Sequence, residues 1–484
     1  MTGRIQWDAT DTRLILVTSL LAALLRVAYV GLTELAPYDP WRHLMLVENL
    51  RLGNGFTLFE GQPYLWYQPP WYALCALFPR AIGPDWIAAV CSLLCVPLMY
   101  LLLRYELPQN GRYAATAAAV LVGCYGPLIN FTCHYGPEAF ALLLTLAAVV
   151  LVRARSDIPT SVVAGLLFGL AVVSRLNFAF NVFLLLPAIV PVRRGLALAA
   201  GIAAPLTLAW WRNHRILDGG EWLFTWDGLA TPTADFNFLS TLVVQMHPDI
   251  GEGLRRLHDQ ILPAPEWTRL GGSLLFLVLA TGCLLAARRG GPGLVFGVGL
   301  LYFMLFDATG TGRFYRAFLG FFPAMMIGIA MVAQRLYGLK PRIGGAALGS
   351  SLIAVALLAG APALRPPTGP ASILGMRVRV PLEMVTPPPE LLGAERFMVN
   401  STFYHPESLM YRFPERRFIG LPLRPERFEA FQRNFPEYRT VLWHDFSVQD
   451  DLLQYLIDSA GFRPVAEATN AHGRSYTVLE RQTD

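Results

Sequence analysis

Apolar segments of roughly 15–20 residues recur along this chain, separated by short loops that carry arginine. A helical stretch of about 20 apolar residues is long enough to cross the hydrocarbon core of a bilayer. Of the 484 residues, 54% are hydrophobic and only 15% are charged, whereas a soluble domain carries about 25% charged residues. The sequence therefore predicts a polytopic membrane protein. The net charge of +5 comes without a basic patch interleaved with aromatic residues, so we expect no nucleic-acid partner.

The order of apolar segments predicts eleven spans with the N-terminus in the cytoplasm. Every loop that this order places inside contains arginine, as the positive-inside rule requires. An odd number of spans then places the C-terminus outside, which for a bacterial inner membrane is the periplasmic side. The predicted spans are residues 14–33, 86–104, 113–130, 138–152, 159–174, 176–190, 196–211, 270–287, 292–306, 317–334 and 343–362.

The predicted fold class is mostly α: a polytopic helical bundle followed by a small α/β domain outside the membrane. The bundle occupies residues 1–364 and includes two long outer loops, 34–85 and 212–269. A Pro-rich linker at 365–395 leads to the soluble domain at 396–484. In this domain strand candidates alternate with helix candidates, which favours a largely parallel sheet. The strand candidates are 396–400, 417–421, 438–444, 463–469 and 474–480, and the helix candidates are 406–413, 424–434 and 447–460.

Asp39 is the first candidate for chemistry, because an ionisable residue at the membrane surface is costly without a partner. It stands just after the first span, between Tyr38 and Pro40. One interpretation is a helix N-cap, with Pro40 at the first helical position and the helix running through Leu50. The other is a carboxylate that acts as general base toward an acceptor hydroxyl. A capping geometry would also orient the side chain, so the two interpretations are compatible.

His43 lies four residues after Asp39, on the same face of such a helix. The pair could share a proton, but no further residues stand at metal-ligand spacing, so a divalent metal is not supported and no cofactor is expected. Aromatic residues in the same loop could stack on a sugar, among them Tyr38, Trp71 and Tyr72. The alternative for most of them is an aromatic belt at the membrane surface.

Five motifs follow one another in order along the bundle. They are Asp39 with Glu48–Thr57 and Gln68-Pro69-Pro70-Trp71-Tyr72, then Gly136-Pro137-Glu138-Ala139-Phe140, Gly165–Arg175, Trp211-Arg212-Asn213-His214, and Arg313-Phe314-Tyr315-Arg316. In this order they resemble the GT-C superfamily of membrane glycosyltransferases. The match is closest to the branch that contains the protein O-mannosyltransferases and the lipid A aminoarabinose transferase.

The resemblance implies a sugar donor on a polyprenyl phosphate, inversion at the anomeric carbon, and a catalytic aspartate at the position of Asp39. Glu138 matches a second acidic position that could orient the acceptor or assist Asp39. It could equally be an acid favoured by the helix dipole. Where the family often has a second carboxylate after the aspartate, this chain has Pro40.

The leaving phosphate needs cations, and four arginines lie at the outer face in the predicted topology. Some family members carry Lys before the Pro-Pro pair, where this chain has Gln68. Arg313, flanked by Tyr315, is therefore the first candidate for the phosphate site. The alternative for each arginine is contact with lipid headgroups. The four arginines are Arg175, Arg212, Arg313 and Arg316.

These features predict an inverting glycosyltransferase that moves a sugar from a polyprenyl-phosphate donor to a hydroxyl of a glycan, lipid or protein acceptor. A transporter of lipid-linked sugars is the first alternative, but it predicts internal repeats and charged or broken helices at the bilayer midplane. A non-catalytic scaffold for envelope assembly is the second. A scaffold would tolerate neutralisation of Asp39, so that substitution separates it from an enzyme.

Overall fold

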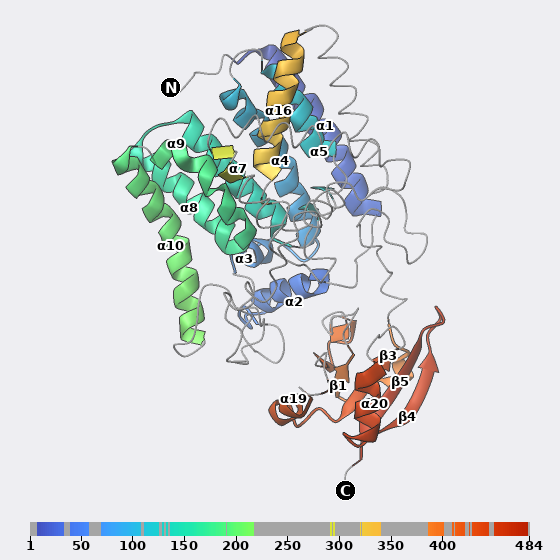
Figure 1. Cartoon of the computed structure of the whole chain (residues 1–484). Coiled ribbons are helices and arrows are strands. Elements are labelled where there is room, and N and C mark those ends of the chain that lie inside the picture. Colours follow the sequence, from blue (N-terminus) through green and yellow to red (C-terminus); the bar gives the residue numbers. More distant parts are fainter. Residues whose placement is uncertain are drawn as a thin grey trace. The chain divides into compact units, whose positions relative to one another are not determined.

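In the residues that the computed structural model describes, the chain forms helices and a five-stranded sheet (Figure 1). The chain divides into two compact units, and each is described by itself. The helical unit comprises Met1–Leu32, Pro63–Pro366 and Ala371–Met376, and the C-terminal unit comprises Thr33–Gln62, Pro367–Pro370 and Arg377–Asp484. The described residues are 7–32, 39–57, 69–107, 111–124, 136–189, 191–216, 322–339, 386–400, 412–421, 428–444 and 450–482, with isolated positions between these ranges.

The helical unit contains helices and no strand in its described residues. Three of these helices, α1, α4 and α10, are long and apolar enough to cross a membrane, and they coincide with the predicted spans at 14–33, 86–104 and 196–211. The elements are α1 (Ala9–Leu32), α3 (Pro70–Ala76), α4 (Pro84–Glu106), α5 (Arg112–Cys124), α7 (Glu138–Ala154), α8 (Ile158–Ser174), η1 (Leu176–Leu185), α9 (Leu186–Ile189), α10 (Val192–Ile216) and α16 (Phe322–Leu339).

The count of eleven spans stays a prediction. Further spans were predicted where helices α5, α7, α8 and α16 lie. Length and apolar composition alone do not identify these four helices as membrane spans. The predicted spans at 270–287, 292–306 and 343–362 lie wholly or almost wholly outside the described residues.

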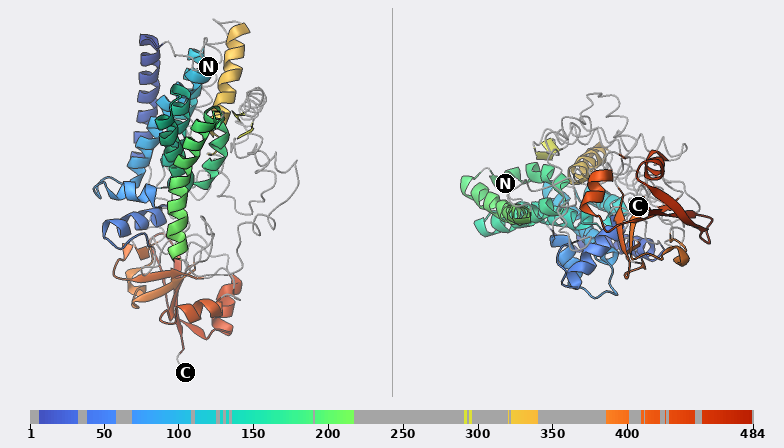
Figure 2. Two further views of the ribbon diagram at one scale, coloured as in Figure 1. Left: turned by 90° about the vertical axis from the view of Figure 1, so that its left-hand side faces the viewer. Right: turned by 90° about the horizontal axis from the view of Figure 1, so that it is seen from below.

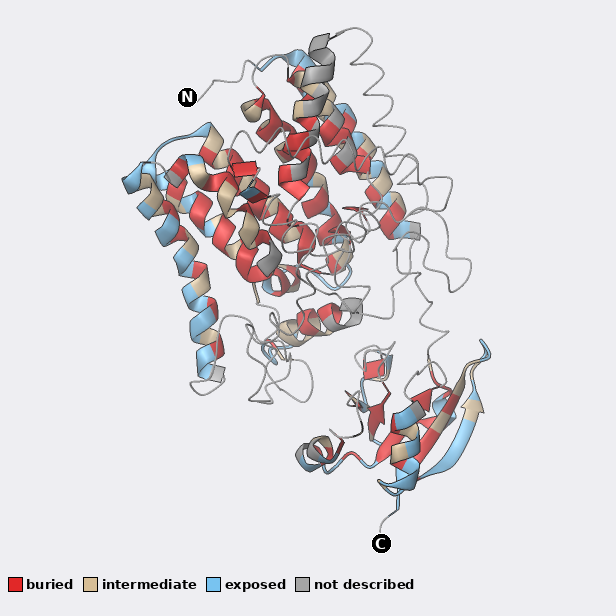
Figure 3. Cartoon of the chain, in the orientation of Figure 1, coloured by how far each residue is buried: buried red, intermediate tan, exposed pale blue. Residues whose placement is uncertain are grey.

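One side of α1 leaves large apolar side chains uncovered. Leu16, Leu20, Leu24 and Val27 are exposed by 63%, 63%, 60% and 54%, and their spacing places them along one stripe of the helix. In contrast, α4 and α7 carry mostly buried residues (Figure 3). A continuous apolar stripe on a long helix is suited to hydrocarbon and not to water. The stripe therefore supports an integral membrane protein.

Helices α8 and α10 pack closely along their length (Figure 2). A Cβ atom at Gly165 would lie 2.3 Å from the Leu198 carbonyl oxygen, and one at Gly201 would lie 2.4 Å from the Val162 carbonyl oxygen. Glycine at these two positions lets the helix backbones touch, which is the usual way that membrane helices associate. Part of the Gly165–Arg175 motif therefore serves helix packing.

Ion pairs join the helices at the end of the bundle where the loop arginines gather. Asp11, fully buried near the start of α1, lies 3.0 Å from Arg104 and 3.2 Å from Arg112. Arg153 at the end of α7 lies 2.7 Å from Glu106 at the end of α4. The loop arginines thus connect α1, α4, α5 and α7, in addition to marking the predicted cytoplasmic side.

The predicted α-helix at 176–190 is wrong for most of its length, because η1 is a 3-10 helix and only the four-residue α9 follows it. Side chains bind carbonyl groups that an α-helix would use internally. Asn181 Nδ2 donates to the Phe178 carbonyl at 3.2 Å, and Arg153 Nη1 donates to the Leu184 carbonyl at 3.0 Å. A 3-10 helix also rises about 2.0 Å per residue instead of 1.5 Å. The segment therefore reaches farther than an α-helix of equal length.

The C-terminal unit contains a five-stranded sheet in the order β2-β1-β3-β5-β4. Its strands agree with the predicted ones to within about two residues, a margin usual for element ends. The prediction of a largely parallel sheet is only half correct: β1 pairs in parallel with β2 and β3, but β5 runs antiparallel to β3 and β4. The elements are α2 (Asp39–Arg51), η7 (Pro389–Leu391), β1 (Arg396–Val399), β2 (Arg417–Gly420), α19 (Phe428–Asn434), β3 (Thr440–His444), α20 (Asp450–Asp458), β4 (Phe462–Thr469) and β5 (Ser475–Arg481).

The tight turn between β4 and β5 explains this difference. Asn470 accepts hydrogen bonds from the backbone N–H groups of His472 and Arg474, and Gly473 has a positive φ of 74°. Strands joined by so short a connection must be antiparallel, since a parallel pair needs a crossover of about a dozen residues or more. The turn residues Asn470-Ala471-His472-Gly473 are therefore a local hairpin signal in the sequence.

Candidate functional site

Asp39 is the first residue of α2, which ends at Arg51. The helix predicted to run from Pro40 through Leu50 is therefore confirmed. Of Asp39 the structure describes the backbone and not the side chain, so its role as base or cap stays a prediction. His43, one turn later, is only 1% exposed. The helix places Asp39 and His43 on one face, as their spacing predicted.

The end of α2 is held by a short loop whose residues belong to the first motif. Asn49 Nδ2 donates to the Thr57 carbonyl at 2.8 Å, and the Asn54 N–H donates to the Asn49 carbonyl at 2.9 Å. Gly53 and Gly55 have positive φ angles of 77° and 76°, which side-chain-bearing residues rarely adopt. These residues of the motif therefore build the loop after α2.

Glu138 and Arg175 meet at the end of the bundle opposite the loop arginines. Glu138 opens α7 and is 2% exposed, and its Oε1 lies 3.3 Å from Arg175 Nη2. Arg175 is the C-cap of α8, with extended backbone angles. An acid at a helix N-terminus and a base at a helix C-terminus are each favoured by the helix dipoles. The second and third motifs thus meet in one ion pair, in which Glu138 is buried and Arg175 is partly exposed.

Trp71 and Tyr72 lie in α3, which packs against α8, and both side chains are fully buried. The Trp71 ring lies 5.8 Å from that of Phe140, which is in the first turn of α7. The fold therefore brings the Pro-Pro-Trp-Tyr segment close to the helix end that carries Glu138. In this structure the two rings are packing residues, and contact with a sugar would require the surrounding side chains to move.

Arg212 lies in the last turns of α10, where its Nη1 donates to Asn213 Oδ1 at 3.2 Å. Around it the Trp210 and His214 rings stack at 5.1 Å, and the Arg215 guanidinium lies 4.9 Å from the centre of the Trp211 ring. The two tryptophans are 44% and 51% exposed. Exposed tryptophans near the end of a spanning helix are typical of the membrane surface.

The remaining predicted site residues lie outside the described residues, and their roles stay predictions. They are Tyr38, Gln68, Arg313, Tyr315 and Arg316. Within the described residues, no three histidine, cysteine, aspartate or glutamate side chains converge as a metal site would require.

Sequence reasoning missed Arg26, which is 2% exposed inside α1. Its guanidinium donates to the Gly123 carbonyl at 2.8 Å, the Val122 carbonyl at 3.3 Å and Ser92 Oγ at 2.9 Å. Val122 and Gly123 lie in the last turn of α5, whose carbonyls have no partner within their own helix. Arg26 therefore caps α5 from a neighbouring helix. An ionisable residue within an apolar span was the signal available in the sequence.

Solved structures share this fold at low sequence identity. ArnT from Cupriavidus metallidurans, solved bound to undecaprenyl phosphate, matches with a TM-score of 0.60 and 12% identity over 97% of this chain and 98% of that chain. The oligosaccharyltransferase AglB from Archaeoglobus fulgidus, solved with an inhibitory peptide and a dolichol-phosphate, matches with a TM-score of 0.52 and 13% identity over 93% of this chain and 71% of that chain.

Both proteins are GT-C superfamily members, so the fold expected from the motifs is confirmed. No protein-family model matches the sequence, and no curated protein matches it either.

Proposed function

We propose that this protein is a membrane glycosyltransferase that moves a sugar from a polyprenyl-phosphate donor to an acceptor hydroxyl at the outer face of a bacterial inner membrane. The observation that carries the proposal is the match, over nearly the full length of both chains, to ArnT bound to undecaprenyl phosphate. The order of the five sequence motifs and the ion pair of Glu138 and Arg175 support it independently.

In the proposed reaction Asp39 accepts the proton of the acceptor hydroxyl, whose oxygen attacks the anomeric carbon opposite the phosphate. The bond to the phosphate oxygen breaks, and the polyprenyl phosphate leaves with the electron pair. This group leaves without being protonated, so one essential carboxylate is sufficient, in contrast to a glycosidase. Positioning of the two substrates and stabilisation of the developing charge lower the barrier.

The leaving phosphate requires cations that are not already neutralised. Arg175 shares its charge with Glu138 at 3.3 Å, so a phosphate would compete with that carboxylate for it. On the basis of the sequence motifs, the proposal keeps Arg313 as the first candidate for the phosphate contact, with Arg316 and Arg212 as further candidates. Glu138 is then assigned to orienting Arg175 and the acceptor, which is a positioning role.

The test compares wild type with Asp39→Asn and Glu138→Gln in purified membranes supplied with native polyprenyl-phosphate-linked sugars. Transfer of radiolabelled sugar and binding of the donor are measured separately. Loss of a general base is expected to lower the transfer rate about 100-fold or more while donor binding is kept. Glu138→Gln is expected to lower the rate less, because it removes a positioning group.

Asp85→Asn is the matched control, since it makes the same chemical change in the first turn of α4. It should leave transfer unchanged at equal expression and monodispersity. Near-normal transfer by Asp39→Asn would show that the proposed base is wrong. Absence of both donor binding and transfer in wild type would favour the scaffold alternative.

A further inference from the structure

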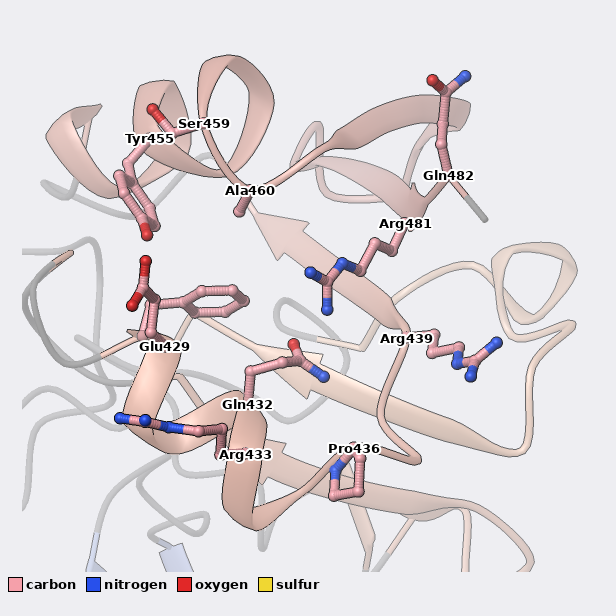
Figure 4. A pocket seen from close by; sticks show the side chains of 11 residues that line it. Glu429, Gln432, Arg433, Pro436, Arg439, Tyr455, Ser459, Ala460, Arg481 and Gln482 are labelled. Carbon is pink, nitrogen blue, oxygen red and sulfur yellow. The ribbon is translucent and has the colours of Figure 1, made fainter. Parts of the chain in front are cut away.

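A cleft of about 770 Å³ opens in the C-terminal unit (Figure 4). Side chains from α19, α20 and the adjoining ends of β3 and β5 line it. Its volume falls within the range of about 300–1,000 Å³ that is usual for small-molecule sites. The proposed transfer reaction assigns no role to it.

The charged residues that line the cleft are three arginines, Arg433, Arg439 and Arg481, and one carboxylate, Glu429. No ion pair within the described part of the chain includes any of the three guanidinium groups. The cleft therefore carries excess positive charge, which favours an anionic ligand.

Arg439 and Arg481 lie directly opposite each other on neighbouring antiparallel strands. The Arg481 N–H donates to the Arg439 carbonyl at 3.0 Å, which continues the register that pairs Thr440 with Glu480. Like charges in directly opposed positions destabilise a sheet. The register therefore places two positive charges side by side at the rim of the cleft.

Gln432 supplies a hydrogen-bond acceptor at the same place. Its side chain is 9% exposed, and its Nε2 donates to the Phe435 and Tyr438 carbonyls at 3.3 Å and 3.0 Å. Its Oε1 has no hydrogen-bond partner among the described residues, and Gln432 and Arg481 point toward the same space in Figure 4. A buried acceptor without a donor is costly, so a ligand with a hydroxyl group would relieve it.

We propose that this cleft binds an acidic sugar, meaning a saccharide that carries a carboxylate or a phosphate group. Its hydroxyl groups would donate to Gln432 Oε1, and its anionic oxygens would accept from Arg481, whose guanidinium points toward Gln432 in Figure 4, while Arg439 adds positive charge at the rim of the cleft. A simple anion such as sulfate offers no donor to Gln432, and a neutral sugar leaves the arginines without a counter-charge. The partly exposed ring of Tyr455, on the opposite wall, offers an apolar face to the sugar.

The position of the cleft also argues against an extended peptide. Peptides that join a sheet add to an edge strand, where backbone groups are free. Arg439 and Arg481 adjoin β3 and β5, which are interior strands of the sheet, whereas β2 and β4 form its edges. The cleft therefore offers side chains and no open strand edge.

The experiment titrates the full chain in detergent micelles with tetragalacturonate and with mannose 6-phosphate, by isothermal titration calorimetry. Maltotetraose, sulfate and a hexaglutamate peptide are titrated in parallel. At least one acidic sugar is expected to bind with an affinity about tenfold or more above that of each of the three comparison ligands. Because sugar transfer is not measured, the outcome is independent of the proposed function.

The double variant Arg439→Gln/Arg481→Gln is expected to weaken binding of the acidic sugar about tenfold or more. Arg412→Gln, at an exposed arginine that does not line the cleft, should leave binding unchanged. Arg481→Lys keeps the positive charge but loses the forked geometry of the guanidinium group. Its affinity for the acidic sugar should lie between those of wild type and the double variant. Circular dichroism and thermal melting verify the fold, which the double variant should preserve because the contacts of Gln432 remain.

Three results would overturn the proposal. The first is that neither acidic sugar binds wild type, and the second is that the double variant binds an acidic sugar as tightly as wild type does. The third is that Arg412→Gln weakens binding as much as the double variant, which would indicate general charge attraction. Tighter binding of hexaglutamate than of either sugar would replace the acidic sugar by an acidic peptide as the ligand.

Discussion

In the helical unit Arg26, Arg104 and Arg153 bind carboxylates or carbonyl groups of other helices, whereas Arg439 and Arg481 of the C-terminal unit form no ion pair among the described residues. The difference follows from the surroundings. A helix in a bilayer has no water to satisfy a charge or a terminal carbonyl, so the protein itself must supply the partner. On a sheet in water the solvent hydrates a guanidinium group, which then stays available to a ligand. Arginine thus joins helices in one unit, whereas in the other we propose that it recognises a ligand.

Substitution of Arg26 tests this comparison with the largest expected effect. Arg26→Met leaves the Val122 and Gly123 carbonyls at the end of α5 without their donor. Each buried acceptor left unpaired costs about 1–3 kcal/mol, so we expect a loss of stability of about 2–4 kcal/mol. The measurement is the thermal unfolding midpoint of the solubilised protein, followed by tryptophan fluorescence.

Arg13→Met is the matched control for this substitution, because Arg13 is an exposed residue of the same helix. Its unfolding midpoint should stay close to that of wild type. Equal midpoints for both variants would contradict the connecting role of Arg26.

Substitution of Arg153 is expected to lower stability by an intermediate amount. Arg153→Gln breaks the ion pair to Glu106 at 2.7 Å and the hydrogen bond to the Leu184 carbonyl at 3.0 Å. Because the pair is partly exposed, we expect a loss of about 1–2 kcal/mol. A double-mutant cycle with Glu106→Gln measures the coupling in the same unfolding assay, and strictly additive effects of the two substitutions would refute the pair.

Substitution of Arg481 should change stability the least of the three, and it should raise stability where the other two lower it. Arg481→Gln removes the repulsion from Arg439 across the strands, so we expect the sheet to gain a few tenths of 1 kcal/mol. Hydrogen exchange of the β3 and β5 amides in the full chain measures this gain. Faster exchange in the variant would show that Arg481 stabilises the sheet, and the contrast between the two units would then fail.

The elements that could be predicted from the sequence are those with a strong local signal. Apolar runs predicted α1, α4 and α10, and the pair Asp39-Pro40 predicted the start of α2. The five strand candidates of the C-terminal domain match the five strands of the sheet. The 3-10 helix η1 was missed, because its conformation depends on side chains from other helices, among them Arg153. The antiparallel hairpin of β4 and β5 was missed although its turn signal at Asn470–Arg474 is local.

The candidate site likewise has features that the sequence predicted and features that only the structure shows. The sequence placed Asp39 and His43 on one face of a helix and indicated that Glu138 and Arg175 would lie at one end of the bundle. Only the tertiary structure showed that Glu138 and Arg175 form an ion pair and that Trp71 packs beside them.

By itself, the sequence determined that this protein enters a membrane, where its five strands lie, roughly where many of its described helices lie, and which superfamily's fold it adopts. The tertiary structure decided which charges are neutralised: Arg26 by the end of α5, Glu138 by Arg175, and Arg439 and Arg481 by no acidic group among the described residues. The physical reason is that helix and strand periodicity is written in neighbouring residues, whereas an ion pair or a cleft joins residues far apart in the chain. Their meeting depends on the packing of the whole unit.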